Sequence, residues 1–82
     1  MRQREGDAER LRTLGAQVRS LRSRRGLTQE DLAEAAGVHR TYVGAVERGE
    51  RNPSFLNLHV LADALEVSVA ELVSGLSEEC RR

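Results

Sequence analysis

The stretch that decides the fold is TQEDLAEAAGVHRTYVGAVERGERNPS, residues 28–54. Its first half predicts a short helix that opens at Thr28, with Asp31 at the third helical position to complete a capping box, and that closes at Gly37. Its second half predicts a helix over residues 40–48. Only a few residues separate the two, so the helices must cross at a large angle. That is the geometry of a helix-turn-helix.

The spacing of small and apolar residues inside this stretch agrees with that geometry. Counted from Gln29 as the first position, the fifth, ninth, fifteenth and eighteenth positions hold Ala33, Gly37, Val43 and Val46. Ala33 is small because the second helix crosses close to it, and Gly37 allows the tight turn. The two valines anchor the second helix on the core, and Gly49 ends that helix.

The flanking sequence adds three more predicted helices. Apolar residues spaced by 3, 4 and 3 positions predict an amphipathic helix over residues 7–25, which Gly26 ends. Ser54 is placed to cap a helix over residues 55–65, whose apolar face recurs at i, i+3, i+4 and i+7. A second capping-box pattern, Ser68 with Glu71, starts a short helix that continues through Leu72, Val73 and Leu76.

Length and composition favour one small all-α domain. The chain has 82 residues, of which 39% are apolar, and this supports a single modest core. Tyr42 and Phe55 are its only aromatic residues, so the core consists of Leu, Val and Ala, which favours helices over a β-sandwich. We expect a compact five-helix bundle over residues 10–76, between a charged segment, residues 1–9, and a flexible tail, residues 77–82.

Several signals of export and of catalysis are missing from the sequence. Cys80 is the only cysteine, no apolar run approaches the roughly 20 residues that span a bilayer, and the N-terminus lacks a secretory apolar stretch, so we expect a cytoplasmic protein. His39 and His59 have no further ligands at metal-binding spacing, and no nucleophile has a base nearby. We therefore expect no enzyme activity, cofactor, metal or small-molecule ligand. Cys80 is either a redox sensor or an incidental thiol.

The formal net charge is zero, yet the charges are unevenly distributed, and all 13 basic residues are Arg. Residues 1–25 carry eight Arg and three acidic residues, whereas residues 52–82 carry two Arg and five acidic residues. A local basic patch can supply phosphate contacts whatever the global charge. Four arginines either add such attraction or form a solvated face: Arg2, Arg4, Arg24 and Arg25.

The stretch of residues 28–54 resembles the helix-turn-helix of Xre/Cro/CI-type bacterial and phage DNA-binding regulators. The resemblance extends over residues 11–76 and includes LRSRRGLTQEDLA before the motif and LADALEVSVAELV after it. HRTY followed by VERG and RNPS is also similar to the controller proteins of restriction-modification systems. The resemblance implies a lambda-repressor-like fold and a transcriptional regulator that binds double-stranded DNA.

In this fold the second helix of the motif enters the major groove with its N-terminal residues towards base edges. The resemblance places Arg40 and Thr41 there as base-reading residues, with Arg40 able to form a bidentate pair with guanine. The alternative for Arg40 is a contact with a phosphate or with solvent alone. Gly44 and Ala45 are expected one turn along the same exposed face, where small side chains permit a close approach to DNA.

The resemblance also implies contacts with the DNA backbone by Gln29, Tyr42, Arg48, Arg51, Asn52 and Asn57. Gln29 is expected to bind a phosphate and to brace the start of the recognition helix. Tyr42 is either a backbone contact or a half-buried packing residue. Asn57 is either a further phosphate contact or an exposed residue without a partner. Such contacts position the protein rather than specify a sequence.

Two further expectations concern packing and assembly. Arg22 and Glu47 match a family ion pair that joins the first and third helices. The last two helices carry more apolar residues than one core stripe requires, which favours a symmetric homodimer on a pseudo-palindromic site through Leu56, Val60, Val69, Val73 and Leu76. The alternative for these five residues is that some line the core and the others are scattered surface residues. The alternative for the function is an antitoxin-like or helical protein-interaction module that acts through the last two helices.

Overall fold

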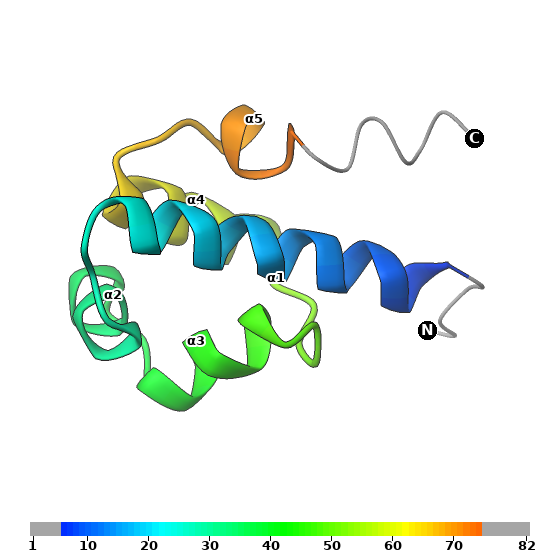
Figure 1. Ribbon diagram of the computed structural model, residues 1–82, viewed down its shortest axis with the longest axis horizontal. Helices are drawn as coiled ribbons and strands as arrows, with labels where there is room; N and C mark the ends of the chain where they lie inside the picture. Colours follow the sequence, from blue (N-terminus) through cyan, green and yellow to red (C-terminus); the bar gives the residue numbers. More distant parts are fainter. Residues whose placement is uncertain (1–5, 75–82) are drawn as a thin grey trace.

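The computed structural model describes residues 6–74, which form five α-helices and confirm the predicted all-α class (Figure 1). In chain order they are α1 (Asp7–Arg24), α2 (Gln29–Ala36), α3 (Arg40–Glu47), α4 (Phe55–Leu65) and α5 (Val69–Leu72). The first four agree with the predicted helices to within one residue. The last is shorter than predicted, and Leu76 lies outside the described residues. Among the described helices, none combines the length and the apolar character that a bilayer span requires.

The helix starts depend on side-chain caps that the sequence signals. At α2 both halves of the capping box are present: Thr28 Oγ1 accepts from the Asp31 N–H at 2.9 Å, and the Thr28 N–H donates to Asp31 Oδ2 at 3.0 Å. Hydrogen bonding holds the pKa of the Asp31 carboxyl below its ordinary value. The bond from the Thr28 backbone N–H has the larger effect, and the Thr28 side chain has the smaller one. Ser54 Oγ and Ser68 Oγ cap α4 and α5 in the same way, although for Ser68 only the hydroxyl half of the predicted box forms.

A single core joins all five helices. Its fully buried side chains come from every element and include Val18 of α1, Leu32 of α2, Val43 and Val46 of α3, Leu61 and Leu65 of α4, and Leu72 of α5. Burying one such side chain contributes about 1.5–3 kcal/mol. Because Val43 and Val46 are both in this core, α3 is held by its inner face while its outer face stays free.

α1 packs closely against the C-terminal end of α3, where two glycines permit the approach. A Cβ atom on Gly15 of α1 would overlap the carbonyl oxygens of Val46 and Glu47. Gly49, just after α3, has a φ of 77°, and a Cβ there would lie 2.8 Å from Arg12 Cγ. Both positions therefore require glycine, and together they fix α3 against α1.

Candidate nucleic-acid interface

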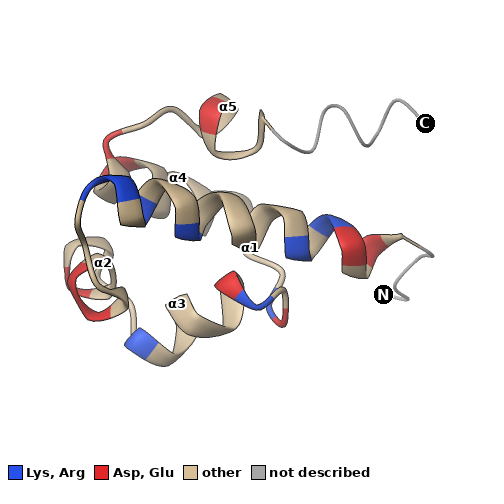
Figure 2. Ribbon diagram, in the orientation of Figure 1, with Lys and Arg blue, Asp and Glu red and all other residues tan. Residues whose placement is uncertain are grey.

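The exposed start of α3 is formed by Arg40 and Thr41 (Figure 2). The Arg40 guanidinium makes no hydrogen bond or ion pair with any residue between positions 6 and 74. His39 precedes the helix without a side-chain cap, so the first backbone N–H groups of α3 lack that partner. A free guanidinium with unpaired amides beside it is a surface suited to an anionic, hydrogen-bonding partner.

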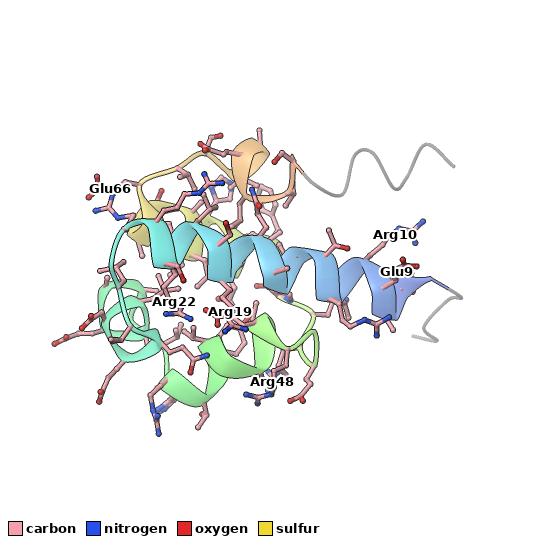
Figure 3. All side chains as sticks on the ribbon, in the orientation of Figure 1. Glu9, Arg10, Arg19, Arg22, Arg48 and Glu66 are labelled. Atoms are coloured by element: carbon pink, nitrogen blue, oxygen red, sulfur yellow. The ribbon has the colours of Figure 1, made fainter. Side chains whose placement is uncertain are left out.

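The carboxylate of Glu47, the last residue of α3, holds α2 and α3 together with α1. Glu47, whose side chain is 4% exposed, receives two hydrogen bonds from Arg22 of α1: Nε to Oε2 at 2.6 Å and Nη2 to Oε1 at 3.1 Å (Figure 3). Arg22 Nη1 donates in addition to the Leu27 carbonyl at 2.8 Å. The hydrogen bond to Glu47 raises the pKa of Arg22, so its guanidinium stays charged. The geometry is that of the ion pair the family resemblance implies.

Gln29 connects α2 to the same carboxylate. Its Nε2 donates to Glu47 Oε1 at 3.0 Å, and the residue is half-buried at the first position of α2. The expectation that Gln29 braces the start of α3 is wrong, because its partner is the last residue of that helix. One amide hydrogen is used in this contact, and the second stays available for a phosphate at the N-terminus of α2.

Gly44 also departs from the sequence-based expectation. It is buried rather than exposed, and a Cβ at this position would lie 3.1 Å from Arg48 Nη1 and 3.5 Å from Gln29 Oε1. Ala45 is half-buried. The small residue at position 44 therefore allows two polar side chains to close over α3, in addition to any approach of DNA.

Tyr42 and Asn57 meet on the other side of α3. Asn57 Nδ2 donates to the Tyr42 hydroxyl at 3.0 Å, and the Arg51 guanidinium carbon lies 5.3 Å from the centre of the Tyr42 ring. Tyr42 is half-buried against the core, as its packing alternative predicts, and its ring still supports a cation. The alternative of an Asn57 without a partner is wrong, because its amide is used to join α4 to α3.

The loop that follows α3 carries the remaining predicted backbone contacts. Arg48 forms a bidentate pair with Glu50 at 3.0 and 3.1 Å, which raises the pKa of Arg48 and lowers that of Glu50. Asn52 and Arg51 are exposed beside it. The loop thus presents polar donors next to α3, but Glu50 offsets part of the charge of Arg48.

The surface predicted for dimerisation is only partly exposed. Leu56 and Phe55 at the start of α4 are 71% and 67% exposed, and the Phe55 ring packs edge-on against His59 with centroids 4.6 Å apart. Val60 is half-buried, whereas Val69 and Val73 pack in part against the core of the same chain. A single copy therefore already shelters α5 and leaves the start of α4 as its large apolar exposure within the described chain.

These features together define a helix-turn-helix of the DNA-binding type. Figure 1 shows α2 viewed nearly along its axis and α3 in the plane below α1, joined by the short turn at residues 37–39. The start of α3 is exposed, whereas Gln29 of α2 and the polar loop after α3 lie at its C-terminal half. This arrangement can present a helix to a major groove with polar donors for the flanking phosphates.

Comparison with known proteins agrees with that class. The chain belongs to the helix-turn-helix family HTH_3, whose model matches residues 18–72. It is 50% identical over 68 residues to control protein C.SmaI of Serratia marcescens, covering 80% of this chain and 81% of that protein. The family consists of transcriptional regulators, not enzymes.

Solved structures of controller proteins share the fold. The restriction-modification controller protein C.AhdI of Aeromonas hydrophila is 48% identical with a TM-score of 0.75, covering 76% of this chain and 94% of that one. Controller protein C.Esp1396I, as a tetramer in complex with its natural 35 base-pair operator, is 32% identical with a TM-score of 0.76, covering 89% of this chain and 96% of that one. The resemblance to controller proteins noted in the sequence is confirmed.

Proposed function

We propose that this protein is a controller of a restriction-modification system that binds a pseudo-palindromic operator as a homodimer in the cytoplasm, with α3 in the major groove. The observation that carries the proposal is the exposed Arg40 and Thr41 at the start of α3, without a partner for Arg40 among residues 6–74. Arg40 reads a guanine, and Thr41 a neighbouring base or its methyl group. The likeness to C.AhdI and to operator-bound C.Esp1396I supports the assignment.

The backbone contacts in this proposal come from residues on both sides of α3. Gln29 offers its second amide hydrogen, Arg51 and Asn52 offer exposed donors, and Arg48 offers a guanidinium whose contact with Glu50 is exposed. Tyr42 and Asn57 are polar at the same border, and their mutual hydrogen bond leaves each a further hydrogen to donate. These residues set the register, and Arg40 sets the preference.

The test is selection of bound sequences from random duplex DNA by the wild type and by Arg40→Ala at matched salt. We expect the wild type to enrich an inverted repeat. Arg40→Ala should lose the preference for a guanine in each half-site, which corresponds to about 1–3 kcal/mol of binding discrimination per half-site. Arg10→Ala is the matched control, because Arg10 pairs with Asp7 at the far end of α1. Enrichment of no sequence by the wild type contradicts the proposal.

The homodimer has its own test. Two recognition helices must stand about 34–36 Å apart to read successive major grooves, and the exposed Leu56 at the start of α4 is the proposed centre of the contact. Leu56→Glu should therefore sediment as a monomer at concentrations where the wild type is a dimer. Equal sedimentation of the two proteins would contradict the proposed interface.

A second candidate function is an antitoxin-like or helical protein-interaction module. The exposed Phe55 and Leu56 favour it, because two large apolar side chains at the start of one helix suit a protein partner. A partner that co-purifies with the wild type, and is lost from Leu56→Glu while Arg40→Ala retains it, would support this function. Both functions can reside in one chain, because α3 and the start of α4 present different side chains.

A further inference from the structure

One face of α1, which we call the arginine stripe, carries three arginines and one glycine and lies outside the helix-turn-helix itself. Positions 12, 15, 19 and 22 follow one another at spacings of 3, 4 and 3, so they lie on one face of α1. Three of them are contacts of α3 or of the loop after it: Arg12 packs on Gly49, Gly15 on the carbonyls of Val46 and Glu47, and Arg22 on Glu47. Arg19 is the fourth member of this face.

Arg12 and Arg19 differ from Arg22 in that Arg22 forms an ion pair with Glu47. Both are exposed, and neither makes a hydrogen bond or an ion pair with any residue in the described range 6–74. Figure 3 shows Arg19 between α1 and α3, in the same region as Arg22 and Arg48. Two other exposed arginines have acidic partners: Arg10 of α1 pairs with Asp7, and Arg25, which follows α1, pairs with Glu66 at the end of α4.

We infer that Arg12 and Arg19 form an additional phosphate-binding surface, by which α1 contacts the DNA backbone next to the groove that α3 occupies. This inference rests on the proposed function. Their neighbours on this side of the molecule are the C-terminal half of α3 and the loop carrying Arg48 and Arg51. The carboxylate at this border, Glu47, is already neutralised by Arg22, so it does not consume either charge.

The chemistry of the stripe suits phosphate and not base recognition. Two guanidinium groups seven residues apart on a helix stand about 10 Å apart along its axis, too far to share one phosphate. They flank α3 rather than continue its exposed start, so they add affinity that is independent of sequence and sensitive to salt. This surface also accounts for how a chain with no net charge attracts a polyanion.

The test is the salt dependence of binding, measured by fluorescence anisotropy on a labelled duplex that carries the repeat enriched by the wild type. Arg12→Gln and Arg19→Gln should each lower the slope of log K against log salt by about 0.9 per protomer, and the double variant by about 1.8. The enriched sequence itself should not change. Arg10→Gln, the same substitution two residues and about 200° around α1 from Arg12, should leave the slope unchanged.

The outcomes separate this inference from the proposed function. If the wild type selects a repeat but the Arg12 and Arg19 variants keep its slope, the inference is overturned and the proposed function stands. A lower melting temperature for Arg19→Gln with an unchanged slope also overturns it, because Arg19 then serves only the α1–α3 contact. If the wild type binds neither the selected nor a random duplex at low salt, both fail.

Discussion

Replacing Glu47 by Ala should destabilise the whole domain. Its carboxylate, 4% exposed, accepts two hydrogen bonds from Arg22 and one from Gln29, so it joins α1, α2 and α3. Truncation leaves the Arg22 guanidinium, 13% exposed, without its counter-ion. Breaking such a buried pair typically costs about 3–5 kcal/mol. At about 4–8 °C per kcal/mol for a domain of this size, Tm should fall by roughly 12 °C or more.

The measurement is thermal unfolding followed by circular dichroism at low protein concentration. Glu50→Ala is the matched control: it also removes the carboxylate of a bidentate Arg pair, but this pair is exposed at 59% and 58%, and Tm should hardly change. A double-mutant cycle with Arg22→Ala should show strong coupling. A Glu47→Ala protein that melts like the wild type, or effects of Arg22→Ala and Glu47→Ala that simply add, would refute the argument.

Four further substitutions, one of them followed as a function of pH, test other parts of the fold. Gly15→Ala should destabilise by about 1–3 kcal/mol through overlap with α3, whereas an unhindered helix position would gain stability from the same change. Tyr42→Phe should cost about 1 kcal/mol, because Asn57 loses its acceptor, and chemical denaturation can measure this loss. Glu66 adopts a left-handed φ of 60° at the end of α4, and its pair with Arg25 is exposed and contributes little, so Glu66→Gly should raise Tm. The pKa of Asp31 is lower in the folded chain than its ordinary value near 3.9, so its stabilising effect is complete above about pH 4 and is lost as the pH falls through the folded pKa. Asp31→Asn should accordingly unfold with a shallower dependence on pH in acid.

The helix boundaries could be predicted because their signals are local. Thr28 with Asp31, Ser54 and Ser68 each satisfy backbone N–H groups within three residues, so the sequence alone indicates where α2, α4 and α5 begin. The length of α5 could not be obtained in this way. Its apolar pattern continues to Leu76, whereas α5 ends at Leu72 and Leu76 lies outside the described residues.

The polar contacts of the site depend on distances across the fold, which no local pattern contains. Gln29 and Glu47 are 18 positions apart, and Tyr42 and Asn57 are 15 apart, so only the packing of α2, α3 and α4 reveals these pairs. Gly15 gave no signal, because a glycine inside a helix looks the same whether or not another backbone approaches it. Gly44 was assigned to the wrong surface for a related reason: the side chains of Gln29 and Arg48 cover it.

The distribution of charge connects the fold with its proposed orientation on DNA. Figure 2 shows basic residues along α1 and at the start of α3, and acidic residues in the first turn of α1, on α2, at the end of α3, at the end of α4 and on α5. Under the proposed function, this distribution favours an orientation in which the start of α3 and the basic side of α1 face the duplex, while α5 and the end of α4 face away from it. If Leu56 forms the homodimer contact proposed above and Arg12 and Arg19 bind phosphates as inferred, each protomer of the dimer adds two phosphate contacts from α1, so dimerisation and the arginine stripe would both increase the affinity for DNA.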